Sequence, residues 1–150
     1  MDWDLVLAGG HHLAVFTLVA IFAAEFALVR PGLSGQRVTQ LARIDGAYGA
    51  VAVLVIAIGL LRIFFGAVDP SYYWGNHAFW GKMGAFLIVG LLSVPPTLAY
   101  RRWAKAGQGD ANYAPSNTEI ATSRRFIHLQ ALFLAFIPLF AATMARGYGS

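Results

Sequence analysis

The chain has no cysteine and very few charged residues. Disulfides, iron–sulfur clusters and thiolate metal sites are therefore excluded, because all of them require cysteine sulfur. Only 12% of the 150 residues are charged, whereas 58% are hydrophobic. A soluble domain of this size needs more polar surface than such a composition supplies. We therefore expect an integral membrane protein in contact with the lipid bilayer.

Acidic residues are scarcer than basic ones. Seven aspartates and glutamates stand against eleven lysines and arginines, and the net charge is +4. In a soluble protein this balance would suggest a nucleic-acid partner. In a membrane protein the preference of basic residues for cytoplasmic loops explains the same excess, so we expect no nucleic-acid partner.

Long apolar runs account for most of the chain. Four stretches reach the roughly 20 residues that cross about 30 Å of hydrocarbon, at about residues 5–29, 44–65, 78–99 and 126–145. A polar linker at 101–125 precedes the last stretch, and its GQGDANYAPSNTE segment has loop composition. Pro138 predicts a kink in the last span. We predict an all-α protein whose residues 1–150 form a single transmembrane domain, a four-helix bundle.

The basic residues gather on one side of the predicted bundle. Eight of the eleven lie in the first loop or the linker, or next to them: Arg30, Arg37, Arg43, Arg101, Arg102, Lys105, Arg124 and Arg125. By the positive-inside rule this side is cytoplasmic, so both termini would face the periplasm across a bacterial inner membrane. The first span follows acidic residues and lacks a basic n-region, so we expect it to stay attached rather than to be removed as a signal peptide.

Polar residues within the spans fall at two depths, and the outer layer is rich in cations and histidines. Its members are His11, His12, Arg62, His77, Lys82 and Arg146. Lys82 lies inside an apolar run, where an ionisable side chain costs roughly 2.5 to 3.5 kcal/mol on insertion scales. The acids on this side lie only in terminal or loop positions, so the layer predicts a receptor for an anionic ligand. The alternative is that the three cations extend to water or lipid phosphate.

Haem b would satisfy both halves of the outer layer. His11 or His12 would ligate the iron, while Arg62, Lys82 and Arg146 would pair with the propionates. A porphyrin substrate would fit the same charges. Adjacent residues point to different faces of a helix, and His11 comes back within about 40° of Glu25 on an ideal helix. If Glu25 faces the interior, His11 does so too.

A second polar layer lies near the predicted cytoplasmic face and contains Glu25, Arg43, Asp45, His128 and Gln130. Glu25 and Asp45 can pair with Arg43, Arg124 or Arg125, and such ion pairs would fix the register of the helices. A proton relay through Glu25 is the alternative. His128 and Arg146 are eighteen residues apart, which is five helical turns, so we expect them to share an inward face.

Four segments carry a family resemblance: HHLAVFTLVAIFAAEFALVRPGLS, ARIDGAYGAVAVLVIAIGLLRIFFG, YYWGNHAFWGKMGAFLIVGLLSVPPTLAYRRW and IPLFAATMARG. They resemble an uncharacterised family of four-span bacterial membrane proteins, one of the domain-of-unknown-function families. The most specific pieces are RIDGAYG, FWGKM, SVPPT and MARG. This resemblance implies the membrane fold and brings no established chemistry.

The outer layer also resembles, more distantly, that of the HemJ-type protoporphyrinogen oxidases, which are similar small membrane bundles. Their first span carries a histidine implicated in haem binding, and their third span begins with a histidine-lysine segment. His12 or His11 looks like the former, and Lys82 after His77 looks like the latter. Where that family has a first-span arginine this chain has Glu25, which weakens the transfer of the oxidase activity. The spacing favours His12, whereas the helical-face argument favours His11, so both stay candidates.

Three functions are compatible with these features, and the residues do not decide whether the protein is an enzyme. The leading hypothesis is an inner-membrane haem-binding or porphyrin-handling redox protein that uses the outer layer. The alternative is a non-catalytic accessory subunit of a larger membrane complex, with the aromatic SYYWGN loop as its docking surface. The third is proton or solute transport through Glu25, Asp45 and His128, which a homo-oligomer could carry out more readily than a lone chain of four spans.

Overall fold

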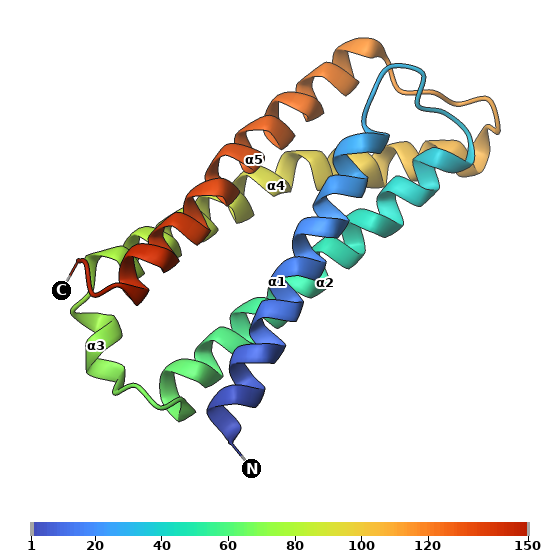
Figure 1. Cartoon of the computed structure of the whole chain (residues 1–150). Coiled ribbons are helices and arrows are strands. Elements are labelled where there is room, and N and C mark those ends of the chain that lie inside the picture. Colours follow the sequence, from blue (N-terminus) through green and yellow to red (C-terminus); the bar gives the residue numbers. More distant parts are fainter. Residues whose placement is uncertain (1, 150) are drawn as a thin grey trace.

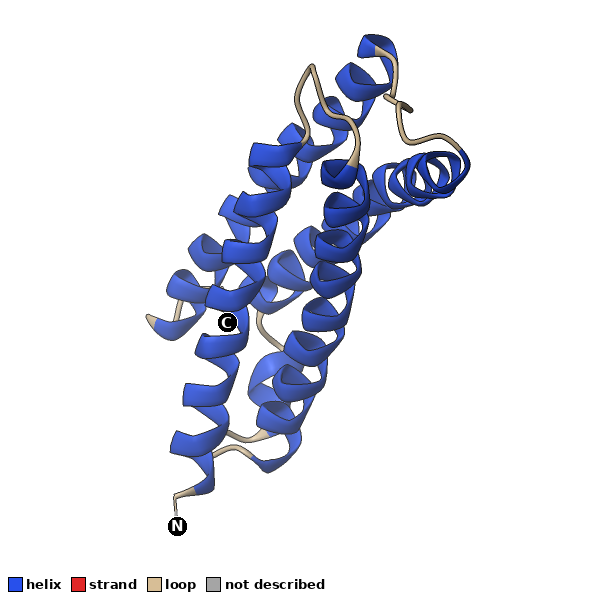
Figure 2. Cartoon of the chain, turned by 90° about the vertical axis from the view of Figure 1, so that its right-hand side faces the viewer, coloured by secondary structure: helices blue, strands red, loops and turns tan. Residues whose placement is uncertain are grey.

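The computed structural model describes residues 2–149, and all regular structure in that part of the chain is helical (Figure 2). The helices are α1 (Trp3–Leu28), α2 (Gln36–Phe65), α3 (Pro70–Trp74), α4 (His77–Gly109) and α5 (Asn117–Ala145). Four of them, α1, α2, α4 and α5, are long and apolar enough to cross a membrane. The predicted all-α membrane bundle with four spans is confirmed, and α3 is a short addition in the connection between α2 and α4.

The long helices form two hairpins (Figure 1). α1 packs along α2, α4 packs along α5, and the two hairpins contact each other chiefly through α2 and α4. Both ends of the described chain and α3 lie at one end of the molecule, which we call the terminal end. The α1–α2 and α4–α5 loops lie together at the other end, the loop end (Figure 1).

The most deeply buried apolar side chains lie near the loop end. Val29, Leu41, Tyr100, Trp103 and Ile127 are each at most 1% exposed and belong to one core cluster. These residues come from all four long helices or the loops that follow them. The loop end is therefore where the two hairpins are held together most firmly.

Large apolar side chains also cover the outside of the bundle. Leu13, Phe16 and Leu87 are more than 60% exposed. In water such a surface would be unfavourable, but around membrane-spanning helices it is the surface that meets lipid. The bundle therefore combines a small internal core with an apolar exterior.

Three helices extend further toward the loop end than the predicted spans. α2 begins at Gln36, α4 continues to Gly109 and α5 begins at Asn117, so that only residues 110–116 of the predicted 101–125 linker lie outside helices. The helices continue because Trp103 and Ile120, beyond the membrane-length runs, are buried in the core. A capping box of Ser116 and Glu119 then starts α5.

Pro95 and Pro96 interrupt the hydrogen-bond ladder of α4, and side chains of other helices compensate. Proline has no N–H, so Pro96 leaves the carbonyl of Leu92 without its partner within the helix. The Gln130 amide of α5 donates to that carbonyl at 3.3 Å and accepts from the Tyr48 hydroxyl of α2, also at 3.3 Å. α4 bends along its length (Figure 1), which is the usual effect of proline inside a helix. This link between three helices makes the proline pair tolerable within the membrane.

Arg124 of α5 closes the end of α1. Its guanidinium donates to the carbonyl of Val29, the residue that caps α1, and lies 5.4 Å from the centroid of the Phe26 ring. A cation is favourable at a helix C-terminus, where the last carbonyl groups lack partners. This contact links α5 to α1 at the loop end.

At the terminal end the last residues fold back onto the start of α4. The His77 N–H donates to the carbonyl of Gly149 at 2.7 Å, and the Asn76 amide donates to that of Tyr148 at 3.4 Å. Gly149 has φ +91° and approaches Ala78 so closely that a Cβ would lie 3.0 Å from the Ala78 nitrogen. Only glycine fits this position without strain.

The Gln130 link predicts the effect of Gln130→Leu. The substitution leaves the Leu92 carbonyl and the Tyr48 hydroxyl unpaired, so the free energy of unfolding should fall by about 1–3 kcal/mol. Thermal unfolding of the detergent-purified protein measures this effect. Gln40→Leu, at an exposed position of α2, is the matched control and should leave the midpoint unchanged. Equal midpoints for both variants would contradict the role given to Gln130.

Candidate functional site

Within residues 2–149, five buried side-chain polar atoms have no hydrogen-bond partner: His11 Nδ1, Arg62 Nε, Glu25 Oε2, Tyr100 Oη and Trp103 Nε1. An unpaired buried polar group costs free energy, and within hydrocarbon there is no bulk water to reduce that cost. Two of these atoms belong to the outer polar layer and three lie near the inner one. Groups of this kind are candidates for contact with a ligand, a proton or water.

At the terminal end the structure brings together His11 of α1, Arg62 of α2 and Lys82 of α4, which we call the cation cluster. All three side chains are partly buried. The charges of Arg62 and Lys82 act on His11, and that of Arg62 also acts on Lys82. The charged groups that act on His11 and Lys82 are all basic, so the cluster as described has no anion to balance it.

The neighbours of the cation cluster fix two of its side chains. The His11 ring packs against Gly59 of α2, where a Cβ would lie 3.4 Å from His11 Cε1. Lys82 Nζ lies 5.5 Å from the centroid of the Phe79 ring. The Asp4 carboxylate of the same end accepts a hydrogen bond from the Ala67 N–H at 3.2 Å, just beyond α2.

The other three residues predicted for the outer layer do not join the cluster. His12 is exposed, and its Nδ1 lies 2.7 Å from the Ala8 carbonyl oxygen of its own helix. His77 is exposed at the start of α4, and Arg146 is exposed at the end of α5. Of the two adjacent histidines, His11 is therefore the one that turns toward other helices.

At the loop end the carboxyl groups of Glu25 in α1 and Asp45 in α2 lie side by side and are 3% and 6% exposed. Tyr100 of α4 reaches Glu25, and Thr97 of α4 reaches Asp45. Arg101 is the basic residue that acts on Asp45. We call these five residues the carboxyl cluster.

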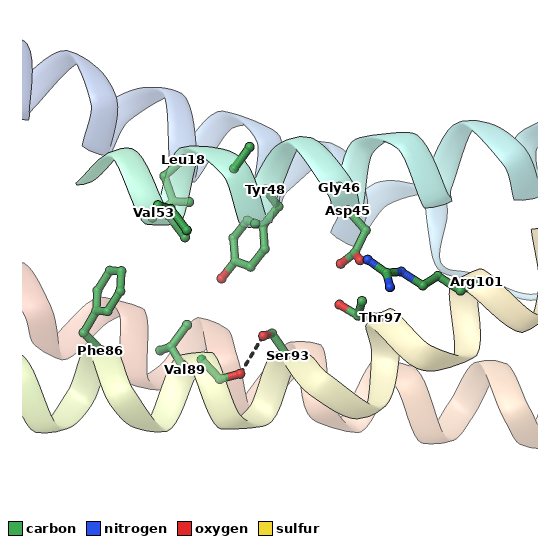
Figure 3. Close-up of a pocket in the computed structure, with 14 residues that line it drawn as sticks. Leu18, Asp45, Gly46, Tyr48, Val53, Phe86, Val89, Ser93, Thr97 and Arg101 are labelled. Carbon is green, nitrogen blue, oxygen red and sulfur yellow. Dashed lines mark hydrogen bonds between the residues drawn. The ribbon is translucent and has the colours of Figure 1, made fainter. Parts of the chain in front are cut away.

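A cavity of about 350 Å³ lies beside the carboxyl cluster, chiefly between α2 and α4. Figure 3 shows Asp45, Thr97 and Arg101 at one end of this space, Tyr48 near the middle and the apolar ring of Phe86 at the other end. Asp45 lines the cavity, whereas Glu25 is not among its lining residues. The cavity thus reaches one carboxyl of the pair and leaves the other behind it.

The basic partners expected for Glu25 and Asp45 differ from those in the structure. Arg43 and Arg125 are exposed, and Arg124 is bonded to the Val29 carbonyl. His128 is exposed and meets the Phe26 ring edge-on, with ring centroids 5.2 Å apart.

The expectation that His128 and Arg146 share an inward face is wrong, because both side chains are exposed. The inward face of α5 is formed instead by its buried residues Ile120, Ser123, Ile127 and Gln130. A residue adjacent to Ile127 is rotated by about 100° and so points away from the core.

Three members of the carboxyl cluster, Thr97, Tyr100 and Arg101, were missed by the sequence analysis. Tyr100 was not singled out as a site residue, and Arg101 was counted only in the charge bias. Their spacing of three and four residues from Thr97 places all three on one side of a helix. That signal required knowing that α4 continues beyond residue 99.

The chain matches one known protein family over nearly its whole length. The family described as "Predicted membrane protein (DUF2214)" matches residues 3–149. The chain belongs to the DUF2214 family. The DUF2214 match covers both clusters and supports the membrane-spanning nature of the chain, but its description names no activity. No curated protein and no solved structure matches the chain, so the likeness to HemJ-type oxidases stays a prediction.

The unpaired hydroxyl of Tyr100 in this DUF2214 protein predicts a contrast between two tyrosine variants. Tyr100→Phe removes a buried hydroxyl that has no partner, so the free energy of unfolding should not fall. Tyr72→Phe removes a hydroxyl that donates to the Met144 carbonyl at 2.7 Å, and should cost about 1 kcal/mol. Unfolding curves in detergent compare the two. A clear loss of stability for Tyr100→Phe would show that its hydroxyl is already bonded.

Proposed function

We propose that the protein is a haem-binding or porphyrin-handling redox protein of the bacterial inner membrane, and that the cation cluster is its ligand site. The observation that supports this proposal is the meeting of His11, Arg62 and Lys82 from three helices, with two buried polar atoms unpartnered and only basic groups acting on the histidine. Ionisable groups held inside a membrane protein without a counter-charge are usually functional.

The chemistry of the cluster fits haem b. Haem combines an iron that an imidazole can ligate with carboxylates that cations bind. His11 Nδ1 is buried, and the ring packs against Gly59, which leaves Nε2 as the nitrogen for the iron. Arg62 and Lys82 would hold the propionates. A bound haem would supply one-electron redox chemistry, and a porphyrin without iron would use the same two cations.

The number of donor side chains also favours haem over a bare metal ion. Residues 2–149 contain no group of three or more His, Asp, Glu or Cys side chains that could hold a metal ion. A bound haem would need only one or two ligands from the protein, and His11 could supply one. His12, His77 and Arg146 are exposed, so we place them outside the proposed site.

The proposed orientation puts the cation cluster on the periplasmic side. The loop end carries most of the basic residues, and the positive-inside rule places such an end in the cytoplasm. Both termini would then be periplasmic. Trp74 and Trp80, which are 45% and 53% exposed, would lie at the periplasmic surface of the inner membrane, where lipid meets water.

The other hypotheses remain predictions. Exposed aromatic side chains around α3 suit an interfacial belt as well as they suit a contact with a complex partner or a second copy, so they do not favour an accessory subunit. His128 is exposed and meets the Phe26 ring, and it is not among the groups that act on Glu25 or Asp45, so it does not support the pathway expected from the sequence.

Absorption spectra of the detergent-purified full-length chain, expressed with ample haem, test the proposal. We expect a Soret band and a reduced α-band in the wild type, because His11 ligates the iron. His11→Ala should lose both bands. His12→Ala is the matched control and should keep them, because His12 is adjacent but exposed. A colourless wild-type protein would overturn the proposal.

A second prediction concerns the two cations proposed to hold the propionates, Arg62 and Lys82. Charge-assisted hydrogen bonds are worth about 1.5–3 kcal/mol, so Arg62→Gln and Lys82→Gln should each weaken haem binding at least about tenfold in a titration of the haem-free protein. Arg146→Gln, which changes an exposed arginine at the same end, should leave the affinity unchanged. If all three variants bind haem equally, the propionates do not lie at the cation cluster.

A further inference from the structure

We propose that Glu25 and Asp45 form a proton-binding site at the loop end, which exchanges its proton through the cavity between α2 and α4. The site is separate from the cation cluster. Glu25 follows His11 by fourteen residues, which is about 21 Å along a helix, so the two sites cannot hold the same small ligand. Failure of the haem proposal would therefore leave this one standing, and the reverse also holds.

Two buried acids meet at the loop end. The carboxyl groups of Glu25 and Asp45 lie side by side and are almost completely buried. Two ionised carboxylates in such a position repel each other strongly, and burial removes the water that would screen them. A single proton shared by the pair removes one of the two charges.

The groups that face the pair from the neighbouring helices supply too little positive charge for two ionised carboxyls. α2 adds Tyr48 and α4 adds Tyr100, both neutral hydroxyls, while the nearby cation of α5, Arg124, is bonded to the Val29 carbonyl. Arg101 of α4 acts on Asp45 but is exposed. Arg101 can therefore balance one ionised carboxyl, and a proton is needed for the other. The geometry assigns that proton to Glu25.

One proton also supplies a missing hydrogen bond. Glu25 Oε2 is buried and has no partner. A protonated Glu25 can donate through Oε2 to the ionised Asp45. The same arrangement without the proton leaves two acceptors facing each other.

The cavity provides the route of exchange. Asp45, Thr97 and Arg101 line its polar end, so water in the cavity would reach Asp45 directly (Figure 3). Glu25 lies behind Asp45 and would gain or lose its proton through it. Exchange would therefore run through the space between α2 and α4.

The other acids of the chain differ from this pair in their hydrogen bonds. The chain has seven Asp and Glu residues, and the five outside this pair each accept a backbone N–H: Asp2 from Leu5, Asp4 from Ala67, Asp69 from Ser71, Asp110 from Asn112 and Glu119 from Ser116. Each of these five carboxyl groups therefore already has a hydrogen-bond donor in the backbone. At Asp69, hydrogen bonds from the Ser71 side chain and N–H hold the pKa below its usual value. Among the acids of residues 2–149, Glu25 and Asp45 are therefore the two that lack such a backbone partner.

Infrared spectroscopy of the full-length protein in lipid nanodiscs, in H₂O and in D₂O at neutral pH, tests the site. We expect a carbonyl band of a protonated carboxyl group that shifts in D₂O, with an intensity of about one group per chain. Glu25→Gln should abolish the band, because Asp45 alone beside Arg101 ionises. Asp110→Asn, at an exposed acid, is the control and should leave the band unchanged.

A wild-type spectrum without the band overturns the proposal by itself, whether or not any variant folds. A band that persists unchanged in Glu25→Gln also overturns it. Asp45→Asn gives an independent check: the band should move in frequency, because the acceptor of the Glu25 proton has changed. A band with the same frequency in Asp45→Asn would show that the two carboxyls do not share the proton.

Discussion

The structure depends on one constraint, which is that polar groups inside a membrane-spanning bundle need partners within the protein. Thr17, Ser93 and Thr143 meet this need locally by donating to carbonyls of their own helices. Where the need cannot be met locally, other helices supply the partner. Gln130 satisfies the carbonyl that Pro96 frees, and Arg124 satisfies the end of α1.

The unpartnered atoms differ from these groups by their positions. In the described chain they gather at two depths, around His11 and Arg62 at the terminal end and around Glu25 and Tyr100 at the loop end. The acids show the same division. Five cap backbone N–H groups, whereas Glu25 and Asp45 lie buried next to each other. Side chains that bind backbone maintain the fold, and the remaining ones are free to bind something else.

Packing differs between the two ends in a way that suits these roles. The core cluster with its nearly inaccessible Leu41, Tyr100 and Trp103 lies at the loop end and holds the carboxyl pair rigidly. The cation cluster lies at the terminal end, where His11, Arg62 and Lys82 are only partly buried. An exchangeable ligand needs access, whereas a proton needs only a neighbouring acid and water.

The helices and their membrane character could be predicted from the sequence because apolar runs of about twenty residues are typical of membrane spans. The sequence left His11 and His12 both open, and the structure turns His11 toward Gly59 of α2 while His12 is exposed. Partnerships between distant segments could not be predicted. The contact of Gln130 with Leu92 and that of Arg101 with Asp45 depend on how α4 packs, and a local pattern does not contain that information.

The length of the helices at the loop end was also underestimated. Hydropathy marks the part of a helix that meets lipid, whereas α4 and α5 continue as polar-surfaced helices with one buried side. Trp103 and Ile120 were the signal for this continuation, but they stand among charged and small residues that resemble a loop. Because the length of α4 was underestimated, Tyr100 and Arg101 were not predicted as site residues.

The cation cluster is proposed to hold an anionic ligand rather than lipid alone. Native mass spectrometry of the full-length 16.2 kDa chain, released from membrane-derived nanodiscs, tests it without assuming which ligand is bound. The account predicts one additional non-lipid molecule per chain, lost from a Lys82→Gln variant and retained in Lys105→Gln at the opposite end. Bare chain and lipid adducts in equal proportion for the wild type and both variants would contradict it.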